Sequence, residues 1–373
     1  MILQDRETVA LAAELPIPEE FETLNLTFTG DLMAHTVNYK MKDYSRIYDD
    51  VRFLLQADDL SFTNFETPVA PSVSMSTYPC FNVHLPYVKA AVDAGFDVFS
   101  LANNHSWDQG DSGIAETLSS FRSIDAIYFS GLKDNHGQEI QPVIINKNGW
   151  TILFVAVTEI LNFPPSRAGK INYLAPDARS REKFLKKLES FRNEHPCDVF
   201  IVSLHTLEPE YVTEVSPEKI EWFDQIAASG VDIIWAHHPH VLQSWTLSAG
   251  VRKAQGAPVL FMYSLGNFIS GQRYRPELSN PGGIREYTGD GVLLQVTLSR
   301  LKNSTGYSKI EVVPIPVTNY TDPRYGAPVV RLFNERFFSD LSAPWVTYYR
   351  KRFDLLQSYL PLLPSIDVPV ILE

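Results

Sequence analysis

The chain is poor in cysteine and has no long hydrophobic run. Only Cys80 and Cys197 occur among 373 residues, so neither a disulfide framework nor a cysteine-based zinc site can be built, and one disulfide between them is the single pairing left open. No apolar run reaches the roughly 18 residues of a membrane helix, and the first residues lack a basic segment followed by an apolar core. The sequence therefore predicts no transmembrane segment, with a removed export signal as the alternative.

Positive charge is also scarce. The 32 Lys and Arg residues stand against 44 Asp and Glu residues, which gives a net charge of -12. Nucleic-acid binding needs clustered Lys and Arg to neutralise phosphates, and no basic stripe with interleaved aromatic residues occurs. We therefore expect no nucleic-acid partner. The hydrophobic fraction of 45% is sufficient for a sizeable core.

What the chain does contain is an alternation of short apolar runs and helix-like stretches. Six runs rich in β-branched and aromatic residues lie at 24–30, 60–65, 96–102, 197–204, 231–236 and 258–265, and helical stretches lie at 44–56, 85–94, 112–123, 180–194 and 217–229. Three more runs, 150–157, 290–299 and 309–317, have no helix between them. The pattern predicts an α/β fold of two packed mixed sheets with helices outside.

No low-complexity linker divides the chain. An arm over residues 1–22 leads into one domain, 23–325, and residues 326–373 are predicted to form a helical extension packed on it. The Pro/Gly-rich segment 270–291 is predicted to be a long loop with a functional role.

Polar residues follow the apolar runs at the points where strands are expected to end. They are Asp31, Glu66, Asn103, Asn104, His105, His205, His237, His238, His240 and Asn267. In open α/β sheets these ends line the ligand crevice. Each residue alone is more typical of an ordinary loop, but six of the nine histidines, at positions 35, 105, 205, 237, 238 and 240, share this placement. The set predicts a site for a divalent ion such as Mn²⁺, Fe²⁺ or Zn²⁺.

The stretch "SLANNHSWDQGDSG" (100–113) is interpreted as a division of roles. The amide oxygen of Asn104 is a candidate ligand, which leaves the ring of His105 to reach a substrate. Asp108 is predicted to orient His105 and to stabilise its protonated form. The alternative is that Asp108 and Asp111 cap the following helix.

Five motifs in order carry a family resemblance: "GDLMAH" (30–35), "NFETP" (64–68), "ANNHSWDQG" (102–110), "HHPHVLQ" (237–243) and "YSLGNFIS" (263–270). They resemble the bacterial capsule-synthesis family of CapA and PgsA, the poly-γ-glutamate biosynthesis proteins, over roughly residues 24–270. That family is similar to the calcineurin-like metallophosphoesterases. The resemblance implies a four-layer α/β/β/α sandwich with a two-metal site between the sheets.

The resemblance also implies roles for single residues. The implied metal ligands are Asp31, Glu66, Asn104, His205, His238 and His240, with Glu66 at the position of a bridging carboxylate. His105, with Asp108, is implied as the group that approaches the substrate. We further predict substrate contacts for Asn267, His237 and Arg273, with the alternative that Arg273 and its neighbours Arg275 and Arg285 are ordinary surface charge.

Two departures from the family pattern bear on the chemistry. Met33 stands where the superfamily has an imidazole ligand, and His35 lies two residues too far along to replace it without a different loop. The segment "HTLEPEY" (205–211) keeps His205, Glu210 and Tyr211 but lacks the Trp and Gly that family members often have after the His. A site short of one ligand is expected to hold one ion tightly and a second weakly.

The leading functional hypothesis is metal-assisted hydrolysis of a phosphoester or an amide in an anionic cell-envelope polymer, with one or two divalent ions activating a water and His105 protonating the leaving group. The alternative is a non-catalytic polymer-binding or scaffold subunit that works with other capsule-synthesis subunits. An intracellular nucleotide phosphoesterase is a third reading. The resemblance favours the cell envelope or its exterior, with the compartment unknown.

Overall fold

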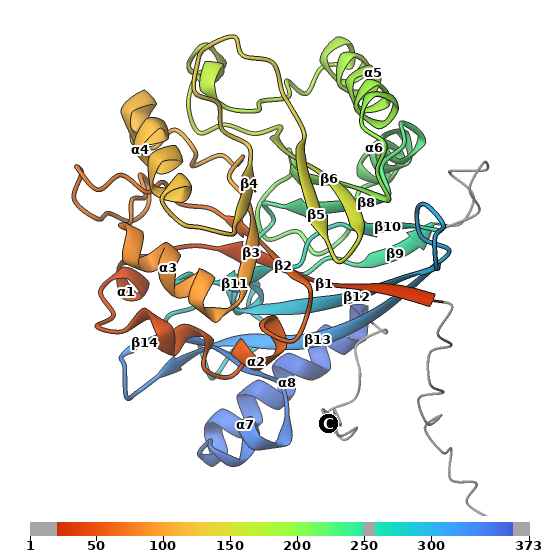
Figure 1. Cartoon of the computed structure of the whole chain (residues 1–373). Helices are drawn as coiled ribbons and strands as arrows, with labels where there is room; N and C mark the ends of the chain where they lie inside the picture. The colour runs from red at the N-terminus through yellow and green to blue at the C-terminus, as the bar shows by residue number, and fades with distance from the viewer. Residues whose placement is uncertain (1–20, 249–257, 361–373) are drawn as a thin grey trace, which may run out of the picture.

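The structure is built around two β-sheets that pack face to face (Figure 1). It is a computed structural model that describes residues 21–248 and 258–360. In spatial order the larger sheet contains β14 (Ala327–Leu332), β13 (Lys309–Asp322), β12 (Asp290–Leu301), β1 (Phe21–Leu32), β2 (Leu60–Phe65), β3 (Phe96–Ser100) and β4 (Tyr128–Ser130), and β11 (Asn267–Ile269) pairs with β1. The smaller sheet contains β5 (Val143–Lys147), β6 (Trp150–Thr158), β7 (Val199–His205), β8 (Ile233–His237), β10 (Val259–Met262) and β9 (Trp245–Ser248).

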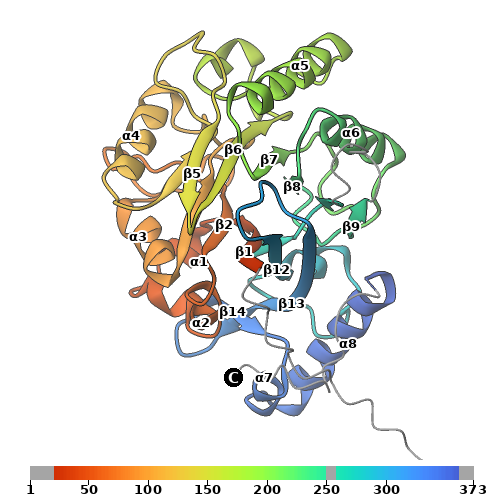
Figure 2. The same cartoon turned by 45° about the vertical axis from the view of Figure 1, so that its right-hand side comes forward.

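Helices cover the outer faces of both sheets (Figures 1 and 2). The larger sheet is covered by α3 (Leu85–Ala94) and α4 (Gly110–Arg122), whose residues share a core cluster with its outer face. The smaller sheet is covered by α5 (Ala178–Glu194) and α6 (Pro217–Ala228). The expected α/β/β/α layering is therefore confirmed.

The central core lies between the two sheets because alternate residues of each strand point inward. Phe28 stacks on Phe62, with ring centroids 4.5 Å apart, and both meet Trp235 of the opposite sheet. The indole Nε1 of Trp235 donates to the carbonyl of Thr29 at 2.9 Å, which ties the sheets together.

The parallel strands bring the site residues to one edge. β1 pairs in parallel with β2, and β2 with β3, while β6, β7 and β8 run parallel in the other sheet. Their carboxyl ends carry the polar residues that follow the apolar runs. Shared strand direction within each sheet is what gathers residues from distant parts of the sequence.

Three sequence-based boundaries differ from the structure. The predicted helix 44–56 is a 3-10 helix, η1 (Tyr44–Tyr48), followed by the short α2 (Arg52–Leu55). Within the predicted arm 1–22, residues 21 and 22 already pair with β12, and residues 1–20 lie outside the described part. The predicted extension 326–373 begins with a strand, since β14 pairs with β13.

The helical part of this C-terminal region comprises α7 (Glu335–Ser339) and α8 (Ala343–Tyr359), and residues 361–373 are outside the described ones. Tyr348, Tyr349 and Phe353 of α8 belong to the same cluster as the inter-sheet core. α8 is thus integrated into the fold, because it buries aromatic side chains against the central core.

The remaining helical segments are short: α1 (Thr36–Tyr39), η2 (Pro165–Lys170) and η3 (Ile284–Gly289). η3 lies inside the predicted long loop 270–291. None of the helices in the described segments is long and apolar enough to cross a membrane. Cys80 and Cys197 do not form a disulfide with each other.

Candidate functional site

Seven predicted site residues lie at or just beyond the strand ends and are buried. Asp31 is near the end of β1, Glu66 follows β2, Asn104 and His105 follow β3, His205 ends β7, and His238 and His240 follow β8. None of the seven is more than 4% exposed. Burial of so many ionisable groups together requires that they partner one another or an ion.

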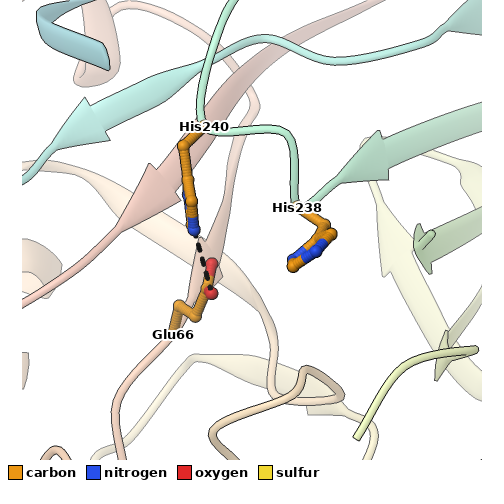
Figure 3. A group of neighbouring side chains, drawn as sticks. All are labelled: Glu66, His238 and His240. Atoms are coloured by element: carbon orange, nitrogen blue, oxygen red, sulfur yellow. Dashed lines mark ion pairs between the residues drawn. The ribbon is translucent and has the colours of Figure 1, made fainter. Parts of the chain in front are cut away.

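Glu66, His238 and His240 form the tightest group. One potential ligand atom from each of these residues lies within 4.8 Å of the others (Figure 3). Figure 3 shows the His240 ring directed at the Glu66 carboxylate, and Nε2 of His240 is 3.8 Å from Oε1 of Glu66. The turn after β8 holds both imidazoles with positive backbone φ, 103° at His238 and 58° at His240. Such conformations cost energy in non-glycine residues and persist where the surroundings enforce them.

Four buried polar atoms on the predicted metal ligands have no hydrogen-bond partner. They are Oε1 of Glu66, Oδ1 of Asn104, Nε2 of His205 and Nδ1 of His238. His205 Nε2 is 3.8 Å from Glu66 Oε1. Buried polar atoms almost always have partners, so four exceptions in one place need an explanation. Carboxylate, amide and imidazole groups are typical ligands of divalent ions, and this set fits such an ion.

Most polar atoms around Asp31 have partners within the protein, although Nδ1 of His237 and Oδ1 of Asn64 have none. His240 Nδ1 lies 3.0 Å from Asp31 Oδ2 and 3.1 Å from Asn267 Oδ1. Met33 occupies the position of the missing imidazole and is 2% exposed. Its thioether is a poor ligand for hard divalent ions. This side of the site therefore offers fewer open ligand atoms than the side around His238.

The electrostatics follow from burial and close charges. Burial by itself favours neutral His240, but the charge of Glu66 and the hydrogen bond to Asp31 outweigh it and raise the pKa of His240 to about 9. Burial also opposes ionisation of Asp31, yet the adjacent His237 and His240 hold its pKa well below the usual value. Burial and the charge of Asp31 raise the pKa of Glu66 well above its usual value. Asp31 and His240 thus form a buried ion pair.

His105 and Asp108 are in direct contact. His105 Nδ1 lies 2.8 Å from Asp108 Oδ2, and the same oxygen accepts from the backbone N–H of Phe81 at 2.7 Å. The helix-capping alternative for Asp108 is wrong, because α4 has Gln109 as its N-cap and no side-chain cap. Asp111 lies in the first turn of α4, where its carboxylate accepts from Trp107 Nε1 at 2.8 Å. Neither aspartate therefore caps the helix.

The three residues predicted to contact substrate are all turned into the protein. His237 is 1% exposed, with Nε2 3.1 Å from Ser203 Oγ and Nδ1 3.4 Å from Asp31 Oδ1. Asn267 Nδ2 donates to the carbonyl of Thr288 at 2.8 Å. Substrate contact by His237 and Asn267 stays a prediction, and both side chains are held beside the Asp31 and His240 pair.

Arg273 is also not available to a substrate. Its guanidinium donates to Asp290 Oδ1 at 2.7 Å and to the carbonyls of Glu286 and Gly289 at 2.8 and 2.9 Å. At 2% exposure it is a structural cation inside the 270–291 loop. The surface-charge alternative is wrong for it as well. Arg275 and Arg285 are exposed.

Two residues near the site were not assigned from the sequence. Asn64 Nδ2 donates to Asp31 Oδ1 at 2.8 Å and to Glu66 Oε2 at 3.2 Å, so it bridges the two carboxylates. Its position two residues before Glu66 in a strand, hence on the same face, was an available signal. Asn162, before η2, lies 3.4 Å from both Asn104 Nδ2 and His105 Nδ1. No sequence pattern indicated Asn162.

The structure defines a class of α/β/β/α sandwich with buried imidazoles and carboxylates at the ends of its parallel strands. Within that class, the model of the bacterial capsule synthesis protein family PGA_cap matches residues 25–272. The chain belongs to this family, as its motifs predicted.

Two curated relatives agree with this assignment. The chain is 30% identical over 316 residues to a capsule biosynthesis protein CapA of Bacillus anthracis, covering 80% of this chain and 68% of that protein. It is 28% identical over 309 residues to a PGA biosynthesis protein CapA of Bacillus subtilis strain 168, covering 80% and 73%.

Solved structures with a similar fold include a novel phosphatase from Mycoplasma pneumoniae, with a TM-score of 0.47 and 19% identity over 82% of this chain and 96% of that one. A hypothetical protein from Thermus thermophilus has a TM-score of 0.44 and 15% identity over 79% and 99%.

Proposed function

We propose that this protein is a metal-dependent hydrolase that cleaves a phosphoester or an amide in an anionic capsule polymer. The observation that carries the proposal is the set of four buried, unpartnered ligand atoms on Glu66, Asn104, His205 and His238. They come from four different strand ends. His205 Nε2 lies 3.8 Å from Glu66 Oε1, and a ring nitrogen of His238 lies within 4.8 Å of a Glu66 oxygen. Residues with a purely structural role normally have all their buried polar atoms hydrogen-bonded.

These four residues, together with Nε2 of His240, would hold the ion. A divalent ion bound there supplies a water of lowered pKa as the nucleophile and polarises the group to be cleaved. Asn64 donates to both Asp31 and Glu66, which fixes the orientation of Glu66. Support from such outer contacts is what sets ligand geometry in metal sites.

His105 is the proposed proton donor. Its Nδ1 is engaged by Asp108 at 2.8 Å, which leaves Nε2 as the nitrogen that can deliver a proton to a leaving group. The carboxylate of Asp108 is held in turn by the backbone N–H of Phe81. Asp108 would therefore act as a positioning residue for His105.

We infer one tightly bound ion rather than two of equal affinity. A second ion would use Asp31 and Nδ1 of His240, which already bond to each other, and Nδ1 also bonds to Asn267. Met33 adds no ligand at this position. A second ion must displace these hydrogen bonds, so it would bind more weakly.

The polymer class is proposed from the relatives. One relative is described as a capsule biosynthesis protein and the other as a PGA biosynthesis protein. Poly-γ-glutamate is accordingly the first substrate to test, and phosphodiesters are the second.

The test combines metal binding with turnover. Metal-depleted protein is titrated with Mn²⁺, Fe²⁺ and Zn²⁺ by calorimetry, and each loaded form is assayed on poly-γ-glutamate and on a chromogenic phosphodiester. We expect binding of one ion and cleavage that is lost in His105→Ala, with metal affinity unchanged in that variant. His195→Ala, at the C-terminal end of α5, is the matched control.

The scaffold alternative has one observation in its favour, which is the loss of an imidazole ligand at Met33. The same experiment separates the two functions. A protein that binds polymer but neither takes up an ion nor cleaves any substrate would be a scaffold, and the hydrolase proposal would be abandoned.

A further inference from the structure

Two adjoining cavities lie on the side of the molecule where α1 and η1 meet the hairpin between β13 and β14. The larger has a volume of about 520 Å³ and is lined by Lys40, Met41, Lys42, Asp43, Arg46, Arg324 and Tyr325. The second, of about 270 Å³, shares Arg46, Arg324 and Tyr325 with it and extends to Arg331 and Arg336. Because they share three lining residues, the cavities form one continuous depression, here termed the basic groove.

The charge of the basic groove is opposite to that of the chain. The larger cavity presents four cationic side chains and one carboxylate, whereas the whole chain has a net charge of -12. A local positive surplus in an acidic protein attracts anions to that place.

Some of these cations are paired and others are not. Arg324 pairs with Asp322 at 2.6 Å and Arg331 with Asp50 at 3.0 Å, so the second cavity is largely neutralised by its own carboxylates. Arg46 pairs with Asp43 and Asp49 at 3.1 and 3.2 Å. Lys40 and Lys42 are exposed, and across residues 21–248 and 258–360 neither forms an ion pair. The free positive charge therefore concentrates in the larger cavity, at the end of α1.

The basic groove lies at the same edge of the larger sheet as the candidate metal centre. β12 runs antiparallel to β1, and β13 antiparallel to β12, so β13 ends, at Asp322, on the edge where β1 ends. β14 is three strands from β1, a lateral distance of roughly 14 Å. α1 contacts β14, and both lie on the same side of the molecule in Figure 1.

The chain itself links the two places. Asp31 and Lys40 are separated by the loop through His35 and by α1. His35 Nδ1 accepts from the backbone N–H of Gly271 at 3.1 Å, which anchors this connection on the 270–291 loop. An extended α-linked polyamide advances roughly 3.3–3.6 Å per unit. A γ-linked glutamate unit has two more backbone atoms and advances further, so fewer than about four such units span the roughly 14 Å between β1 and β14.

We propose that the basic groove is a binding subsite for the anionic polymer, which holds several successive carboxylates beside the metal centre through Lys40 and Lys42. The inference rests on the proposed function for its substrate class. Such a subsite differs from a site for a single anion. Cations spread along a groove can contact several carboxylates of one chain, so they bind a polymer more tightly than a single ion. Affinity should therefore increase with polymer length and decrease with salt.

The experiment measures binding of poly-γ-glutamate oligomers of increasing length at low and high ionic strength, using the full chain with its metal. The test variant is Lys40→Gln/Lys42→Gln, which removes two exposed charges. The matched control is Lys183→Gln/Lys186→Gln on α5, which removes two exposed charges from a distant helix. We expect affinity for long oligomers to fall about tenfold in the test variant and to stay unchanged in the control.

Two further arms keep this proposal separate from the proposed function. His238→Ala, which impairs the metal centre, should still bind long oligomers with the same length dependence even though it cleaves nothing. Inorganic phosphate is titrated as the single-anion probe. Three results would each overturn the groove as a polymer subsite. The first is an equal loss of oligomer affinity in the test and control variants, and the second is an oligomer affinity that does not depend on length. The third is an affinity for phosphate as high as that for the longest oligomer.

Discussion

The candidate site has two sides that differ in whether their buried polar atoms form hydrogen bonds within the protein. The open side comprises Asn104, His205 and His238 with Oε1 of Glu66, and its ligand atoms have no partner in the protein. The paired side comprises Asp31, His240 and Asn267, whose polar atoms bond to one another at 3.0 and 3.1 Å. The two sides are built from similar residues at neighbouring strand ends, yet the carboxylate and imidazole of the Asp31–His240 pair bond to each other. Beside that pair, Nδ1 of His237 and Oδ1 of Asn64 have no hydrogen-bond partner.

The difference shows how the loss of a ligand changes a buried site. With Met33 in place of an imidazole, the remaining polar groups of the paired side cannot stay unpartnered inside the protein, because unpaired buried charge is costly. They form an ion pair that stabilises the fold. The open side keeps its unsatisfied atoms, which are favourable only when an ion completes them. The paired side should therefore contribute mainly to stability and the open side mainly to metal binding.

The largest expected effect is on the paired side. His240→Ala leaves Asp31 buried without its cationic partner, so we expect the free energy of unfolding of the metal-free protein to fall by about 3–5 kcal/mol. Urea denaturation measures it. Asp31→Asn in the His240→Ala background removes the orphaned charge and should recover part of the loss. No loss of stability in His240→Ala would contradict the buried ion pair.

On the open side, a substitution should change metal affinity rather than the free energy of unfolding. His238→Ala removes a ligand whose Nδ1 has no protein partner, so the metal-free protein should unfold at nearly the same urea concentration as the wild type. Metal affinity should fall at least about 100-fold, since even residues behind the ligands change it by 10–100-fold. Calorimetry measures the affinity. If His238→Ala and His240→Ala lost stability and affinity in the same proportion, the distinction between the two sides would not hold.

A ligand can be added back to the paired side. Met33 lies two residues after Asp31 and directly after the end of β1 at Leu32, so a histidine there would return an imidazole to the position that Met33 occupies. We expect Met33→His to bind a second ion about tenfold more tightly than the wild type, a gain of about 1.4 kcal/mol. Met33→Leu is the control of similar size. Equal second-ion affinity in both variants would mean that Met33 does not limit the site.

The two sheets, and the placement of His205 and His238 at strand ends, could be predicted from the sequence because both depend on the local pattern of apolar runs. Residues that follow apolar runs, such as His205 and His238, reach one edge whenever the strands are parallel. Prediction from the sequence failed where the role of a residue depends on tertiary contacts. Arg273 looks like a loop cation in the sequence, but the fold buries it against Asp290.

The prediction of an all-helical C-terminal region was wrong for a related reason. Residues 327–332 form a strand only because β13 is there to pair with them. The sequence between 44 and 56 has helical composition, yet the structure divides it into η1 and α2. Asn162 lies in a loop without periodicity, and only the fold brings it beside Asn104 and His105.

Asn162 gives the smallest and most local test of the open side. Its Oδ1 lies 3.4 Å from Asn104 Nδ2, a long hydrogen bond that turns the amide so that Asn104 Oδ1 is left free for an ion. Because Asn162 is exposed and these contacts are weak, Asn162→Ala should lower metal affinity by only about threefold to tenfold and leave the unfolding transition unchanged. Asn162→Asp keeps an oxygen that accepts from Asn104, so it should restore the affinity. Failure of the aspartate variant to do so would show that Asn104 is oriented by other contacts.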